Sequence, residues 1–489
     1  MKKATGQSIS VGEKVGYSLG DVSANLVFQI MMVYQLKFYT DIFGLDGTIA
    51  GTVLLFAPLA SAFIDPLVGI VTDRTHTRWG KYRPWLLWTA VPFSVFYFLA
   101  FHNPGIHDKT LVAVYATISY VLMLAFYGFN NTPYASLGGV MSGDPRERNS
   151  INTFRFVAAA VAQFVVQGLT LPLVSRFGGG NDERGWTCTI GLFAIFVCLF
   201  SLIAFFTTRE RISPPQQQKM SISEDVRKTF GCAPWRCMFF LTLILYITLA
   251  LWSSSMNYYF QDYLDAQALA SMLSRFGFDV SPSEAYTVGF SVFNTLNAVV
   301  QFFGILFLSS FFANRYGKRT TFLVGLSLFT VLTAMFYMAS PESPLLVFVL
   351  CALRSLVFAP TIPLLWAMVA DSADYVEYTH HRRATGFCFS GIVFALKGGM
   401  GIGAAIAGLL LSAFGYQSAS SGVQSQSAIQ GIRLAASLIP AVLLAGSVIA
   451  IWKYPITKTF NEKMQAELEA RRSLEKLKTT NNKELWQQT

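Results

Sequence analysis

Long apolar runs alternate with short polar connections along nearly the whole chain. Each run is long enough to cross a bilayer as a helix, which needs about 20 predominantly apolar residues. Charged residues make up only 13% of the 489 residues, whereas soluble domains carry roughly 25%. The pattern predicts an all-α membrane protein with twelve transmembrane helices, at residues 14–42, 48–72, 84–103, 110–141, 149–175, 186–208, 236–263, 285–312, 320–339, 344–375, 384–414 and 430–454.

A basic connection that contains prolines and glutamines separates the first six runs from the last six. This composition is typical of a linker. We therefore predict a first six-helix bundle at 1–208, a cytoplasmic linker at 209–235, a second six-helix bundle at 236–455 and a cytoplasmic tail at 456–489.

The distribution of basic residues predicts the orientation in the membrane, because Lys and Arg gather in cytoplasmic loops. The basic connections are 69–84, 144–148, 209–235, 315–319 and 380–383, and those without Lys or Arg are 44–48, 340–344 and 415–430. Both chain termini are accordingly predicted to be cytoplasmic. The net charge of +10 is explained by this orientation, and no nucleic-acid partner is expected.

Ionisable side chains inside the apolar runs are candidate functional residues, because they are costly in hydrocarbon and usually face a cavity. Asp65 precedes a proline in the second run, and a proline frees a backbone carbonyl on the preceding turn. Oxygen ligands for a cation, or a proton site, are therefore expected there. Arg155 and Lys397 have no carboxylate three or four residues away in their own helices, so each is expected to contact substrate, cavity water or another helix.

Amide and aromatic side chains in the same runs suit a sugar, because amides bind hydroxyl groups and flat rings cover the C–H face of the sugar. The amides are Asn25, Asn130, Asn131 and Gln163, and the rings are Tyr127, Tyr134 and Trp366.

Lys37 and Asp41 are four residues apart, which predicts a local ion pair. A run of small residues at 398–405 predicts close helix packing in the eleventh span.

The basic stretch 69–84 (GIVTDRTHTRWGKYRP) resembles the loop between helices 2 and 3 of the major facilitator superfamily, and residues 314–319 repeat it more weakly in the second half. The resemblance implies the major facilitator fold, with two six-helix bundles facing each other. Transport by alternating access then needs contacts at the cytoplasmic face that differ between states. The residues expected to make these gating contacts are Asp73, Arg74, Asp371, Asp374 and Arg382.

Further segments resemble the glycoside–pentoside–hexuronide:cation symporters, the family of melibiose permease. They are GYSLGD at 16–21, FYTD at 38–41, DP at 65–66, RWGKYRPW at 78–85, NTPY at 131–134, DPRER at 144–148, ADSADYVEY at 370–378 and KGG at 397–399. They follow the family's order over nearly the whole chain, but they do not specify the sugar.

Carried over by position, the resemblance implies particular site residues. The substrate site would consist of Asn25, Asn131, Tyr134 (beside Ala135), Arg155, Trp366 and Lys397. The cation site would consist of Asp65, Ser61 and Asn131. Melibiose permease has aspartates in place of Asn25, Asn131 and Ser61 and a tryptophan in place of Ala135, and the missing carboxylate weakens a Na⁺ cage at Asp65. We therefore favour H⁺ over Na⁺ as the coupling cation and an acidic glycoside over a neutral one.

The predicted function is cation-coupled symport of a glycoside or hexuronide across a bacterial inner membrane, by a monomer without a cofactor. The alternative is a lipid or lysolipid transporter on the related fold, which would have a more apolar cavity. An enzyme is not expected, because the sequence shows no metal-ligand set, nucleophile triad or paired catalytic carboxylates.

Overall fold

The computed structural model describes residues 9–142, 145–211, 230–380, 385–417, 424–468 and 470. These residues form an all-helical bundle without a named strand in the described ranges. The helices are α1 (Val11–Lys37), η1 (Phe38–Ile42), α2 (Gly47–Asp73), α3 (Arg83–Ala100), α4 (Lys109–Met141), α5 (Pro145–Gly178), α6 (Asp182–Thr207), α8 (Ala233–Tyr258), η2 (Tyr259–Tyr263), α9 (Ala266–Arg275), α10 (Ala285–Tyr316), α11 (Lys318–Met335), η3 (Phe336–Met338), α12 (Pro344–Phe358), α13 (Thr361–His380), α14 (Thr385–Ala413), α15 (Gln426–Ala435) and α16 (Leu438–Trp452).

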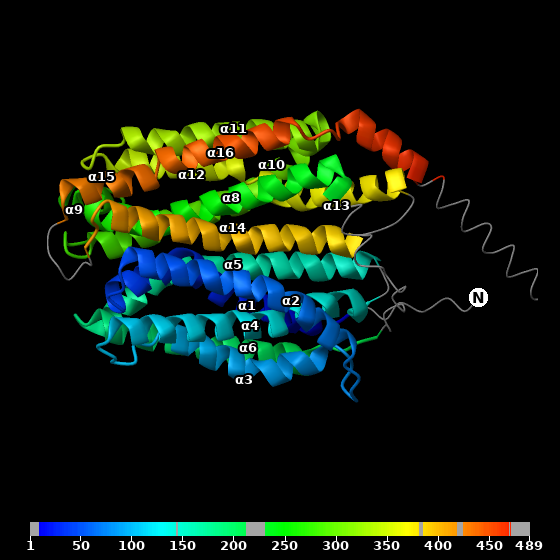
Figure 1. The fold of residues 1–489 in the computed structure, drawn as a ribbon, viewed down its shortest axis with the longest axis horizontal. Coiled ribbons are helices and arrows are strands. Elements are labelled where there is room, and N and C mark those ends of the chain that lie inside the picture. The colour runs from blue at the N-terminus through cyan, green and yellow to red at the C-terminus, as the bar shows by residue number, and fades with distance from the viewer. Residues whose placement is uncertain are drawn as a thin grey trace, which may run out of the picture.

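The helices α1–α6, called the first half, lie on one side of the molecule, and the helices α8–α16, called the second half, lie on the other (Figure 1). The halves meet where α2 packs on α14, α5 on α10 and α1 on α8. Helices α9 and α15 lie at one end of the bundle, called the α9 end. A helix at residues 458–468 lies at the opposite end, called the tail end.

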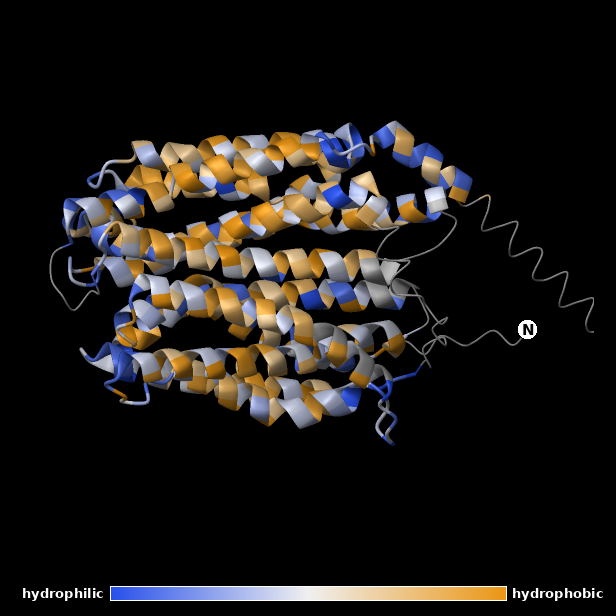
Figure 2. Cartoon of the chain, in the orientation of Figure 1, coloured by the Kyte–Doolittle hydropathy of each residue, from blue (hydrophilic) through white to orange (hydrophobic). Residues whose placement is uncertain are grey.

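Ten spans in the described ranges are long and apolar enough to cross a membrane. Two of the twelve predicted spans do not reach that threshold: the one that α1 forms, which carries several charged residues, and the one that α3 forms, which begins at Arg83. Hydrophobic residues cover the middle of the bundle and hydrophilic ones gather at both ends (Figure 2). The arrangement agrees with the predicted all-α major facilitator fold.

Two predicted spans are each broken into two helices. The span predicted at 344–375 divides into α12 and α13 around residues 359–360, where Pro360 has no backbone N–H to continue the helix. The span predicted at 430–454 begins earlier, as α15, and breaks before α16 at Ser437, which has φ −137° and ψ −85°. The hydrophobic pattern continues on both sides of each break, so the sequence did not predict either one.

The small residues of α14 allow close packing, as the sequence predicted. A Cβ on Gly403 would lie 2.2 Å from the carbonyl oxygen of Ile247 in α8, and one on Gly408 would lie 2.2 Å from that of Gly47 in α2. Larger residues would separate the backbones. Helix α14 is thus held between a helix of its own half and a helix of the first half.

The C-terminal helix packs against the second half. Met464 and Leu468 are each only 1% exposed, and the Lys458 Nζ donates to the carbonyl oxygen of Asn314 at 2.8 Å. Thr457 caps this helix, since its Oγ1 accepts from the N–H of Phe460.

Candidate functional site

A cavity of about 230 Å³ lies between the halves. The first half contributes three glutamines, and the second half contributes most of the aromatic rings and one arginine. The polar wall residues are Gln29, Gln163, Gln167, Ser253, Asn297, Gln301, Arg354, Ser355 and Thr361, and the aromatic ones are Phe28, Tyr246, Trp252, Phe329, Phe358 and Trp366. Amides beside flat rings form a surface suited to a polyhydroxylated ligand.

The glutamine wall is partly preorganised. Gln167 Nε2 in α5 donates to Gln29 Oε1 in α1 at 3.1 Å, while the Gln167 Oε1 is buried without a hydrogen-bond partner in the described residues. Gln163 lies one helical turn before Gln167, so both can face the cavity. Sequence reasoning selected Gln163 and missed Gln29, Gln167 and Gln301, although glutamines spaced by four in an apolar helix were a visible signal.

Of the six residues of the predicted substrate site, all of them described in the structure, Trp366 alone lines this cavity. Its ring stacks on Phe389, with centroids 6.3 Å apart and planes within 5°. Asn25 and Asn131 make local contacts instead: Asn25 Nδ2 donates to the carbonyl oxygen of Asp21 at 2.9 Å, and Asn131 Nδ2 donates to the Tyr127 hydroxyl at 3.4 Å.

Arg155 forms an ion pair inside the first half. Its Nη2 lies 3.0 Å from Asp21 Oδ1, joining α5 to α1. The guanidinium carbon is 5.2 Å from the ring centroid of Tyr134 and 6.0 Å from that of Tyr17, and these two rings stack at 4.6 Å. No carboxylate lies three or four residues from Arg155 in α5, and Asp21 of α1 supplies the carboxylate partner instead. Tyr134 belongs to the same cluster.

Lys397 joins α14 to the predicted cation site. Its Nζ donates to Ser61 Oγ in α2 at 3.2 Å, which connects the two halves. Asp65 follows Ser61 by one turn of the same helix, but its side chain lies outside the described part of the structure.

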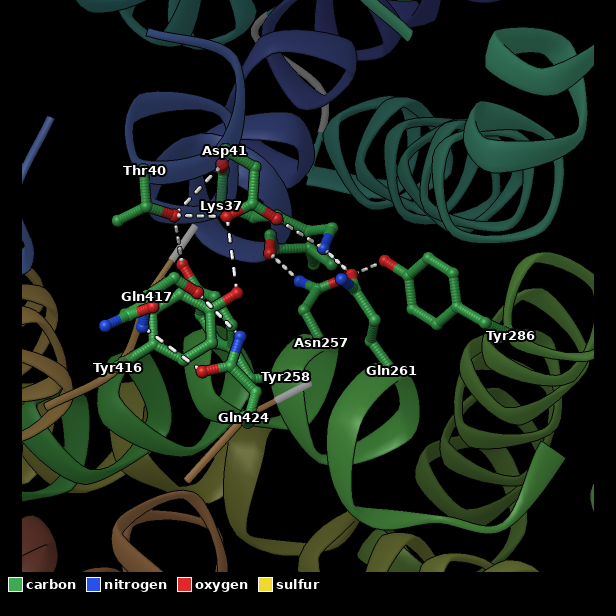
Figure 3. A network of polar contacts seen from close by, with 11 residues as sticks. Lys37, Thr40, Asp41, Asn257, Tyr258, Gln261, Tyr286, Tyr416, Gln417 and Gln424 are labelled. Carbon is green, nitrogen blue, oxygen red and sulfur yellow. Dashed lines mark hydrogen bonds and ion pairs between the residues drawn. The ribbon is translucent and has the colours of Figure 1, made fainter. Parts of the chain in front are cut away.

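A polar network joins the halves at the α9 end (Figure 3). Lys37 Nζ lies 2.8 Å from Asp41 Oδ2, which confirms the predicted local pair, and it also donates to Gln261 Oε1 in the second half. Further contacts between the halves in this network are Asn257 Nδ2 to the carbonyl of Val33, the Thr40 and Tyr258 hydroxyls at 2.8 Å, and the Tyr416 hydroxyl to Asp41 Oδ1 at 3.4 Å. This network holds the two halves together at the α9 end.

Asp371 and Asp374, two of the predicted gating residues, lie at the tail end. Asp371 accepts two hydrogen bonds from Lys318 Nζ, at 2.7 and 2.8 Å, and Asp374 accepts one from Gln465 at 2.9 Å, all within the second half and its tail. Arg74 is exposed. Arg382 and the side chain of Asp73 lie outside the described part of the structure.

The loop that resembles the major facilitator motif is held by Glu210. Its carboxylate accepts from the backbone N–H groups of Lys81, Tyr82 and Arg83, at 2.7–2.9 Å. Gly80, at φ +113°, supplies the turn that aims these N–H groups at one acceptor. The sequence motif is defined by its basic residues, whereas the carboxylate that fixes the loop belongs to an acidic residue at least 127 positions away.

A neighbouring ion pair ties the start of α1 to the residues after α6. Arg211 makes a two-pronged contact with the Glu13 carboxylate, at 2.7 and 2.8 Å, and the hydrogen bond to this anion raises the pKa of Arg211. No cluster of metal-ligating side chains occurs within the ranges described above.

Comparisons with known proteins agree on one family. The family model described as MFS/sugar transport protein matches residues 16–279 and 285–458. The putative glycoside/cation symporter YagG of Escherichia coli is 32% identical over 94% of this chain and 95% of its own length. The glucuronide carrier protein homolog of the same organism is 29% identical over 96% and 98%. The structure of a D-xylose-proton symporter superposes with a TM-score of 0.62 at 14% identity, covering 91% of this chain and 98% of that one, and so supports the fold.

Proposed function

The chain belongs to the MFS/sugar transport protein family, and we propose that it is a cation-coupled symporter of a glycoside or hexuronide. The observation that carries the proposal is the cavity between the halves, whose glutamines and aromatic rings suit sugar hydroxyl groups and sugar faces. The same polar walls argue against the lipid or lysolipid alternative, because acyl chains favour an apolar lining. Relatives named as symporters support the coupling to a cation.

The side of the membrane toward which the cavity opens follows from where the two halves are in contact. We place the α9 end outside the cell and the tail end, with both termini, in the cytoplasm of a bacterial inner membrane. The basic connections 69–84 and 315–319 and the helix at 458–468 lie at the tail end, and basic connections gather on the cytoplasmic side of a membrane. With the α9 end closed by the network around Lys37 and Asp41, this state would load or release substrate toward the cytoplasm.

The coupling cation is proposed to act at Asp65, with Ser61 and Asn131 nearby in the site. Lys397 already donates a hydrogen bond to the Ser61 hydroxyl. An ammonium group next to that oxygen repels a second cation, which disfavours Na⁺ there. We therefore favour H⁺ as the coupling cation.

Uptake into energised membrane vesicles tests the proposal. Wild-type protein should concentrate a radiolabelled glycoside or uronide, and a protonophore should abolish the accumulation. Asp65→Asn should lose accumulation but keep exchange of substrate across the membrane, whereas the exposed control Asp279→Asn should behave as wild type. Accumulation unchanged in Asp65→Asn would remove its coupling role, and sodium-dependent uptake insensitive to the protonophore would overturn the choice of H⁺.

A further inference from the structure

Arg354 is a buried cation in the wall of the cavity. It belongs to α12 and is only 3% exposed. Its Nε donates to Thr333 Oγ1 in α11 at 3.0 Å. In the described residues its Nη2 is buried without a hydrogen-bond partner, and no carboxylate forms an ion pair with it. Its charge is thus left without an anion.

Aromatic rings compensate this charge only in part. The guanidinium carbon lies 3.6 Å from the ring centroid of Trp252 and 4.2 Å from that of Phe329. Ring faces attract a cation but accept few of its hydrogen bonds. A buried guanidinium with an unused N–H group is costly, and a carboxylate relieves that cost through a charge-assisted, two-pronged contact.

The neighbours of Arg354 offer contacts for the rest of a sugar. The Ser355 hydroxyl donates to Asn297 Oδ1, and both residues line the cavity together with Gln301. Trp252 and Trp366 supply flat faces in the same wall. One cation beside amides and rings is the pattern that distinguishes an acidic sugar from a neutral one.

We propose that Arg354 binds the carboxylate of the transported sugar and sets a preference for hexuronides over neutral hexosides. The proposal rests on the function proposed above. It moves the anion-recognising role from Arg155, whose charge is paired with Asp21, to an arginine of the opposite half. Turning the guanidinium about its last torsions would bring its free N–H groups to a ligand in the cavity.

Binding of a matched pair of ligands tests this role. Purified full-length protein is titrated with 4-nitrophenyl glucuronide and 4-nitrophenyl glucoside, which differ only in the carboxylate at C6. Wild-type protein should bind the glucuronide about tenfold more tightly or better, because the contact between the two charges is lost with the glucoside. Arg354→Gln should weaken glucuronide binding by about tenfold, change glucoside binding by less than about threefold, and so remove the preference.

Two further variants separate recognition from folding. Arg354→Lys keeps the charge and should retain part of the preference. Arg433→Gln is the control: this arginine stacks on Tyr337 and donates to its carbonyl, does not line the cavity, and should leave the ratio unchanged.

Each binding result either supports or overturns the role proposed for Arg354. Equal wild-type affinity for the two ligands overturns the inference without any variant, which covers the case in which Arg354→Gln fails to fold. A ratio that stays the same in Arg354→Gln also overturns it and leaves the symporter function standing. Failure of wild-type protein to bind either ligand overturns the proposed function and this inference with it.

Discussion

Arg155 and Arg354 are both arginines within the helices of the bundle, one in each half, yet they are stabilised differently. Arg155 has a carboxylate, Asp21, at 3.0 Å and two tyrosine rings around it. Arg354 has two aromatic rings and a single hydroxyl. A paired arginine joins helices of its own half, whereas an unpaired arginine in a cavity wall remains available to an anion. The residue type alone therefore does not indicate the role.

The largest expected effect comes from breaking the pair in the first half. Asp21→Asn leaves Arg155 without its anion in a mostly buried site and should destabilise the protein by about 3 kcal/mol. Arg155→Gln in the same chain should recover part of that loss, since no unpaired charge remains. Unfolding of the purified single and double variants by SDS titration measures the coupling free energy. A double variant that is less stable than Asp21→Asn would show that the pair is not the relevant interaction.

The comparison also shows what sequence could predict. Apolar runs predicted the twelve spans and small residues predicted the close packing of α14, because hydrophobic pattern and residue size act locally. The pairing of Arg155 with Asp21 involves residues 134 positions apart, and the carboxylate is on another helix. Spacing within one helix cannot reveal such a partner.

The candidate site was predictable only in outline. Trp366 lines the cavity, although its role in substrate binding stays a prediction, and the Lys37–Asp41 pair was confirmed because it is local. Gln29 and Arg354 were missed as wall residues, since which face of a helix meets the opposite half depends on tertiary packing. The assignments of Asn25, Asn131 and Asp65 remain predictions that the transport assays test.

A smaller effect is expected at the arginine of the second half. Trp252→Leu removes the nearer ring face, and a desolvated cation–π contact contributes about 2 kcal/mol. The coupling free energy should appear in a cycle with Arg354→Met, because the ring's attraction is lost once the charge is absent. Trp88→Leu, at a 47% exposed tryptophan, serves as the control for ring removal. Additive effects of Trp252→Leu and Arg354→Met would mean that the ring stabilises the core without stabilising the cation.

The smallest effect on stability is expected at the tail end, where the cation of the pair is accessible to water. Lys318 is 35% exposed and lines an open pocket with Asp371, whose side chain is 9% exposed. Breaking this pair should therefore cost only about 0.5–1 kcal/mol, since water replaces the lost partner of Lys318.

The proposed gating role requires Asp371 to exchange Lys318 for a contact with the first half when this end closes. Asp371→Asn should thus shift the distribution of distances between spin labels placed at Arg74 and Glu462 while leaving unfolding almost unchanged. A distribution identical to that of wild-type protein, with and without substrate, would show that Asp371 takes no part in closing the tail end.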